Sequence, residues 1–168
     1  DHLLEARARV RTLAASKVRE VANECFGQEG IQRFWFGESD QPTPAYLRDA
    51  GAKALAAGRT FYSHNQGIAE LRAAIARYLT RLHGRPFDSA QVSVTSSGVS
   101  ALMIIMQALL DPGDRVLAVT PVWPNVTEIP RILGAEVERV GLEARDGRWH
   151  LDVGRLLWTA AGKPRVAV

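Results

Sequence analysis

Short apolar runs alternate with helical segments in the second half of the sequence, and this alternation limits the possible folds more than any other feature. Four runs have the composition of strands: Val92–Thr95, Val116–Val119, residues 135–140 and Val166–Val168. The helical segments between them are Val99–Leu110, residues 125–133 and Leu151–Ala161. Such alternation is typical of an α/β fold, a mainly parallel sheet with helices on both faces. We expect Val92–Thr95 and Val116–Val119 to lie side by side, and the apolar helix Val99–Leu110 to be buried.

The residues before Val92 are predicted to be mainly helical. The expected helices are residues 3–25, a segment from Pro44 to about Ala57, and residues 68–82, and glycines follow each of them. Thr43-Pro44 is typical of an N-cap followed by proline at the first helical position. The sequence therefore predicts an N-terminal helical segment ahead of the sheet.

Composition argues against several classes of protein. Of the 168 residues, 46% are hydrophobic and 23% are charged, close to globular averages and unlike a disordered chain. The longest apolar stretch, Ala101–Leu110, is too short to cross a bilayer, so no membrane association is expected. The net charge is only +3 and the basic residues are dispersed, whereas nucleic-acid binders gather them on one face.

Cysteine and histidine usage gives no sign of a metal site. The single cysteine, Cys25, excludes an internal disulfide and a thiolate metal cluster, and it fits a reducing cytoplasm. The four histidines do not have the spacing of metal ligands. We therefore expect a cytoplasmic protein without a bound metal.

The strongest local signal for chemistry is the segment from Thr95 to Ser100, at a strand-to-helix junction. A helix N-terminus presents unpaired N–H groups and the positive end of the helix dipole, and Gly98 would let an anion approach the backbone. This arrangement indicates a phosphate site. An equally good interpretation from this segment alone is that Ser97 only caps the helix. The dinucleotide fingerprint and the Walker loop are both absent from the sequence.

A tryptophan between two prolines of a loop forms the second candidate. Trp123 follows the second strand, and neighbouring prolines would hold its ring so that it could stack on a ligand. Ligands of such sheets bind beyond the carboxyl ends of the strands, so we expect Ser97, Gly98 and Trp123 to line one pocket. The alternative is that Trp123 only packs against its surroundings.

Four motifs, taken in order, resemble the N-terminal part of class I and II aminotransferases, which are fold-type I enzymes that use pyridoxal 5′-phosphate. The motifs are Phe36 to Pro44, the run from Tyr62 through Gly67 to Ala76, Val94 to Leu102, and Pro121 to Asn125. Ser39 stands where the family often has proline. Each motif alone is weak, whereas the four in order are specific and extend over nearly the whole chain.

The resemblance implies a role for each candidate residue. Ser97, Gly98 and Val99 would hold the cofactor phosphate, and Trp123 would stack on its pyridine ring. Gly37 would let the backbone approach the substrate carboxylate. Tyr62 would reach the cofactor phosphate of a partner subunit, which implies a homodimer. The implied substrates are an amino acid and a 2-oxo acid.

The resemblance also implies that further parts of such an enzyme follow residue 168, among them the Schiff-base lysine. We expect residues 1–45 to be an N-terminal helix and substrate loop on the small-domain side, and residues 46–168 to be the first part of the cofactor-binding large domain. We expect none of the three lysines in the sequence to reach the cofactor: Lys17, Lys53 and Lys163. The chain by itself is therefore expected to be inactive and to expose apolar surface.

The sequence is also compatible with two other functions. The chain could belong to a non-catalytic, aminotransferase-like domain of a fused transcription regulator. It could also come from a fold-type I lyase or synthase that uses the same phosphate site.

Overall fold

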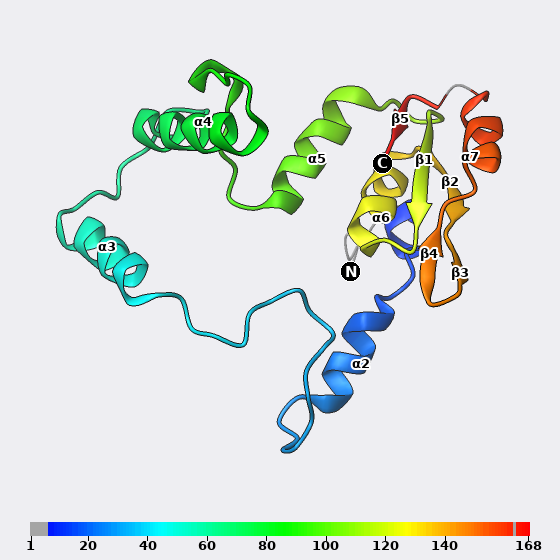
Figure 1. Ribbon diagram of the computed structural model, residues 1–168, viewed down its shortest axis with the longest axis horizontal. Helices are drawn as coiled ribbons and strands as arrows, with labels where there is room; N and C mark the ends of the chain where they lie inside the picture. Colours follow the sequence, from blue (N-terminus) through cyan, green and yellow to red (C-terminus); the bar gives the residue numbers. More distant parts are fainter. Residues whose placement is uncertain (1–6, 163) are drawn as a thin grey trace, which may run out of the picture. The chain divides into compact units, whose positions relative to one another are not determined.

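The computed structural model describes residues 7–162 and 164–168. Two compact units divide the chain. Unit 1 consists of Asp1–Glu20 and Ser97–Val168, and unit 2 consists of Val21–Ser96. Figure 1 shows the strands gathered among the later residues, coloured yellow-green to red, and helices alone in the cyan and green part of the chain.

A parallel three-stranded sheet forms the centre of unit 1. Its middle strand is β1 (Arg115–Thr120), with β2 (Glu136–Gly141) on one side and β5 (Val166–Ala167) on the other. Val116 lies opposite Val137 of β2 and opposite Val166 of β5, and both pairings are parallel. The predicted α/β fold with a parallel sheet is confirmed.

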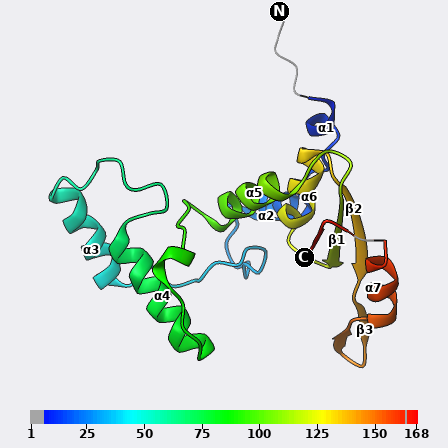
Figure 2. The same ribbon diagram turned by 90° about the horizontal axis from the view of Figure 1, so that it is seen from above.

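Helices cover both faces of this sheet, as Figures 1 and 2 show. On one face lie α5 (Gly98–Leu109) and α6 (Pro124–Leu133), and on the other lies α7 (Val153–Ala160). Five buried residues from the two helices, the sheet and the adjoining turns form the core: Met106, Leu110, Val116, Ile129 and Ala135. Apolar side chains from segments far apart in sequence thus meet on one face of β1.

The predicted strand Val92–Thr95 is wrong, because these residues belong to no strand of the described structure. The backbone of Val92 is extended, but the N–H of Val94 donates to the carbonyl of Gln66 in a loop of unit 2. Both edges of β1 are already paired, with β2 and β5. Since a strand can have only two neighbours in a sheet, no position beside β1 remains for Val92–Thr95.

The predicted burial of the apolar helix is only partly correct. Met106 of α5 is 2% exposed, whereas Ile104 and Ile105 are 57% and 49% exposed. The helix packs on α6 and the sheet with one face, so its other face stays outside whatever its composition.

A short hairpin in unit 1 was not expected from the sequence. Strands β3 (Glu143–Arg145) and β4 (Arg148–His150) pair antiparallel around the two residues Asp146 and Gly147. Both of these residues have positive φ angles, 50° and 71°. Asp-Gly is the preferred pair for such a turn, so the dipeptide itself was the signal that could have predicted the hairpin.

The predicted N-terminal helix is interrupted in the structure. It consists of α1 (Ala8–Arg11) and α2 (Lys17–Cys25), and residues 3–6 of the predicted helix lie outside the described part. The side-chain oxygen of Ser16 accepts a hydrogen bond from the N–H of Arg19 over 3.3 Å. Ser16, the residue just before α2, thus satisfies a first-turn N–H group of that helix.

Unit 2 contains α3 (Ala45–Ala56), α4 (Ala69–His83) and the 3-10 helix η1 (Ser89–Gln91). Pro44 is the N-cap of α3, one position later than the predicted Thr43. Helix α4 ends at Gly84, as expected. Asp88 and Gln91 form a capping box around η1.

Helices long and apolar enough to cross a membrane are absent from residues 7–162 and 164–168.

Candidate functional site

The first turn of α5 carries the predicted anion-binding residues of unit 1. Ser97 is the N-cap, and its hydroxyl oxygen accepts a hydrogen bond from the N–H of Ser100 over 3.1 Å. The two hydroxyl oxygens of Ser97 and Ser100 lie 3.0 Å apart. Ser97 therefore does cap the helix, and this takes up one of the four N–H groups that a first turn leaves without an intrahelical acceptor.

The residues of this turn fit a phosphate group. A Cβ atom built on Gly98 would meet no described atom within 4 Å, so the space beside the helix end is open. The N–H groups of Gly98 and Val99 stand at the positive end of a 12-residue helix. Backbone donors, serine hydroxyls and a positive dipole end are the donor set that suits an anion, with about 0.3–1 kcal/mol for each exposed charge–dipole contact.

The second predicted segment follows the carboxyl end of β1. The peptide bond between Thr120 and Pro121 is cis. Trp123 is the N-cap residue of α6, and Pro124 occupies the first helical position. The Trp123 side chain is half exposed. Its position is thus defined by β1 on one side and α6 on the other, and part of its ring surface is accessible to a ligand.

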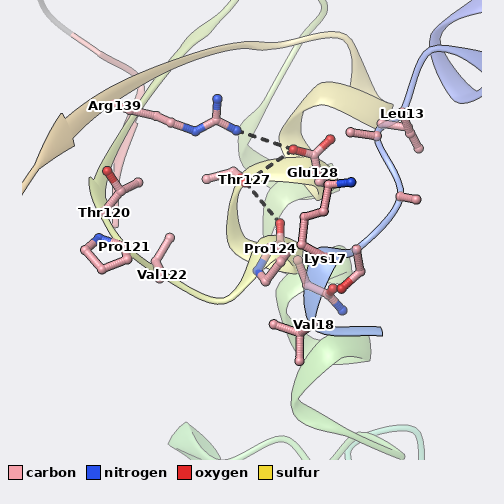
Figure 3. Close-up of a pocket in the computed structure, with 14 residues that line it drawn as sticks. Leu13, Lys17, Val18, Thr120, Pro121, Val122, Pro124, Thr127, Glu128 and Arg139 are labelled. Carbon is pink, nitrogen blue, oxygen red and sulfur yellow. Dashed lines mark hydrogen bonds and ion pairs between the residues drawn. The ribbon is translucent and has the colours of Figure 1, made fainter. Parts of the chain in front are cut away.

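A cavity of about 500 Å³ lies beside this segment, and Figure 3 shows the residues around it. Thr120 to Val122 form one wall and Leu13 to Val18 another, and a third consists of Pro124, Asn125, Thr127 and Glu128. Glu128 accepts a hydrogen bond from Arg139 over 3.4 Å. It also accepts one over 2.8 Å from Arg131, which does not line the cavity. The cavity therefore has mainly apolar walls and one charged corner.

The lining of this cavity omits the predicted ligand contacts. It includes residues on both sides of Trp123 but neither Trp123 nor Ser97 nor Gly98. That the three residues share one pocket stays a prediction. The contribution of Leu13 to Val18 was missed, because nothing in the spacing of that segment relates it to a loop more than a hundred positions away.

Gly37 and Tyr62 belong to unit 2. Both lie in loops, and the Tyr62 side chain is fully exposed. A Cβ atom on Gly37 would meet no described atom within 4 Å, which leaves room for a ligand to approach the backbone.

Metal ligands do not cluster in the described residues, where no three His, Cys, Asp or Glu side chains are placed to hold an ion. Lys17 lies on α2 with its amino group 2.8 Å from Glu20, and Lys53 lies on α3. Lys163 is outside the described residues.

A family model described as aminotransferase class I and II matches residues 34–167. The chain belongs to this family. The resemblance carried by the four motifs is thereby confirmed. Class I and II aminotransferases depend on pyridoxal phosphate, and the turn of α5 fits the phosphate of that cofactor.

Relatives from thermophilic bacteria are similar over part of the chain. The aspartate/prephenate aminotransferase of Thermus thermophilus is 38% identical over 111 residues, which are 66% of this chain and 29% of the relative. A probable aspartate/prephenate aminotransferase of Thermus aquaticus is 41% identical over 98 residues, which are 58% of this chain and 26% of the relative.

Solved aminotransferase structures match more of the chain. Aspartate aminotransferase from Thermus thermophilus with maleate has a TM-score of 0.75 and 32% identity, covering 84% of this chain and 38% of that one. Alanine aminotransferase from Pyrococcus furiosus has a TM-score of 0.76 and 26% identity, covering 92% and 40%. The chain thus spans well under half the length of these aminotransferases.

Proposed function

We propose that the full-length protein is a pyridoxal-phosphate-dependent aminotransferase, which moves an amino group from an amino acid to a 2-oxo acid. The observation that carries this proposal is the family match over residues 34–167. The names of the two Thermus relatives make aspartate the first amino donor to test.

The proposed cofactor site consists of the α5 turn and the loop after β1. Ser97, Gly98 and Val99 hold the phosphate through a serine hydroxyl and backbone N–H groups, and Trp123 stacks on the pyridine ring. The open space at Gly98 and the half-exposed Trp123 ring support this assignment. When bound, pyridoxal phosphate supplies the electron sink that amino-group transfer requires.

The protein's own residues bind and orient in this scheme. Backbone donors in a folded helix turn are directed before the ligand arrives, so little ordering is needed on binding. Stacking on Trp123 fixes the ring plane and contributes about 0.5–1.5 kcal/mol beyond burial. Gly37 keeps a loop backbone accessible to the substrate carboxylate.

Further parts of the proposal concern assembly and location. The protein forms a homodimer in which Tyr62 reaches the cofactor phosphate of the partner subunit, and the full exposure of Tyr62 supports this. Residues 1–45 belong to the small-domain side and residues 46–168 to the large domain. A cytoplasmic location is supported by the single cysteine.

Gly98→Asp in the full-length protein tests the phosphate assignment. The new carboxylate would stand at the position of the phosphate, so we expect pyridoxal phosphate to be retained at less than about a tenth of its wild-type level, given that tenfold in affinity corresponds to about 1.4 kcal/mol. The bound cofactor is measured by absorbance after gel filtration. Unchanged retention would contradict the assignment.

Transfer itself is tested with aspartate and 2-oxoglutarate. We expect glutamate to form in proportion to enzyme. A protein that retains the cofactor but transfers no amino group from any of the common amino acids would favour a lyase, a synthase or a non-catalytic domain.

A further inference from the structure

The cavity beside the loop after β1 has the size and the walls of a small-molecule site. Its volume of about 500 Å³ lies within the range of about 300–1,000 Å³ that is usual for such sites. All of its lining residues belong to unit 1. Two of its walls present apolar side chains, among them Leu13 and Val18 on one side and Pro121 and Val122 on the other. These walls suit the hydrocarbon part of a ligand.

The charged corner of this cavity carries an excess of positive charge. Glu128 of α6 accepts one hydrogen bond from Arg131 over 2.8 Å and another from Arg139 over 3.4 Å. Two guanidinium groups thus share one carboxylate, which leaves one positive charge over. Lys17 also lines the cavity, but its amino group lies 2.8 Å from Glu20, whose charge balances it. The corner therefore favours an anionic group on a ligand.

Arg139 is the residue at this corner that can bind such a group. Its bond to Glu128 is longer than the usual span of about 2.7–3.2 Å, and its guanidinium makes no other hydrogen bond within residues 7–162 and 164–168. Figure 3 shows the guanidinium pointing toward Glu128. The side chain is half exposed, and it lies on β2, an edge strand, opposite the small Ala118. A guanidinium in this state can bind a carboxylate through two parallel hydrogen bonds.

We propose that this cavity binds a small carboxylic acid with an apolar body. The Arg139 guanidinium binds the carboxylate, and the apolar walls contact the hydrocarbon part. The proposal goes beyond the function proposed above and does not depend on it, because the lining contains none of the proposed cofactor contacts, which are Ser97, Gly98, Val99 and Trp123.

Three probes test the two halves of the site. 3-Phenylpropionate carries both a carboxylate and a phenyl ring, 3-phenylpropan-1-ol lacks the charge, and propionate lacks the ring. Binding to the full-length protein is measured by isothermal titration calorimetry. We expect 3-phenylpropionate to bind at least about tenfold more tightly than either of the other probes, because each of them loses one set of contacts. Equal binding of the alcohol would overturn the proposal.

Arg139→Gln tests the residue itself. This variant loses the charged donor, so we expect 3-phenylpropionate to bind about tenfold more weakly and the alcohol to bind within about twofold of wild type. Arg139→Lys keeps the charge without the planar fork and should give an intermediate affinity. Arg148→Gln is the matched control, since Arg148 is exposed on β4 (Arg148–His150) of the same unit and does not line the cavity. We expect it to bind all three probes as wild type does.

Glu128→Gln should change the affinity in the opposite direction. It removes the carboxylate that competes for Arg139 and that repels an anionic ligand, so we expect 3-phenylpropionate to bind about threefold more tightly. A purely structural role for the pair of Glu128 and Arg139 predicts no such gain.

The decisive result is the dependence of binding on Arg139. An affinity for 3-phenylpropionate that is unchanged in both Arg139 variants would overturn the proposal, and if Arg139→Gln does not fold, Arg139→Lys decides alone. Repeating the titration in saturating aspartate identifies the natural source of the acid. Binding that persists and still needs Arg139 indicates an acid other than the amino donor, whereas loss of this binding indicates that the cavity holds the substrate. Because cofactor retention and amino transfer are measured separately, the proposed function can fail while this site stands.

Discussion

The two units are stabilised in different ways. In unit 1 a parallel sheet brings α5, α6 and three strands together, and the largest fully buried side chains, such as Met106 and Leu117, are there. The buried hydrophobic residues described in unit 2 are Ala22, Ala76 and Val92, while Phe34 and Phe61 are 87% and 92% exposed. Side-chain packing in a common core thus dominates in unit 1, whereas the described part of unit 2 buries few hydrophobic side chains.

This difference follows from the elements that each unit contains. A sheet gathers side chains from distant segments onto one face, and these fill a common core. In the described part of unit 2, the buried side chains on helices are the small ones of Ala22 and Ala76. Substitutions should therefore act through lost volume in unit 1 and through backbone conformation in unit 2.

The largest expected effect is the loss of a buried side chain in unit 1. Met106→Ala should lower the free energy of unfolding by about 2–5 kcal/mol, because it leaves a cavity beside Val116 and Ile129. Urea unfolding of the full-length protein measures the change. Ile105→Ala on the same helix is the control, and its half-exposed side chain should cost less than about 1 kcal/mol. Similar values for the two variants would break the comparison between packed and exposed faces.

The next effect concerns the backbone of unit 2. Gly67→Ala should cost about 1–3 kcal/mol, because alanine is strained at φ +95° and its Cβ would overlap Val94. Gly51→Ala provides the opposite sign. Gly51 lies inside α3 with no described atom within 4 Å of its Cβ position, so alanine should stabilise by up to about 1 kcal/mol. Thermal unfolding of both variants checks the signs, and a neutral Gly67→Ala would remove the evidence for a close backbone contact.

The smallest effect is expected at the edge of unit 1. Asp152 caps α7 by accepting a hydrogen bond from the N–H of Arg155 over 2.9 Å. Asp152→Ala should lower the free energy of unfolding by about 0.5–2 kcal/mol, whereas Asp152→Asn should be nearly neutral since asparagine caps equally well. Urea midpoints distinguish the two. An equal loss in both variants would assign the effect to charge and not to capping.

Local patterns in the sequence determined much of what the structure contains. The 3.6-residue periodicity predicted α4 and its end at Gly84, and the serine and glycine at residues 97 and 98 predicted the start of α5. The order of the four motifs determined the family. The Asp-Gly pair at Asp146 and Gly147 was equally informative for the hairpin. These features depend on residues that are close in sequence, so they can be predicted from the sequence alone.

Which strands pair, and which segments line the cavity, was decided only by the tertiary structure. Val92–Thr95 has strand-like composition, yet β2 and β5 occupy both edges of β1. The cavity likewise joins residues far apart in the chain, because Leu13 to Val18 form one of its walls. The same is true of the hydrogen bonds that Arg72 donates to the carbonyl groups of Ser89 and Val92. A segment with strand-like composition can pair with many different strands. Its place in the sheet therefore depends on which distant segments compete for the limited number of strand edges, and the local sequence does not determine that outcome.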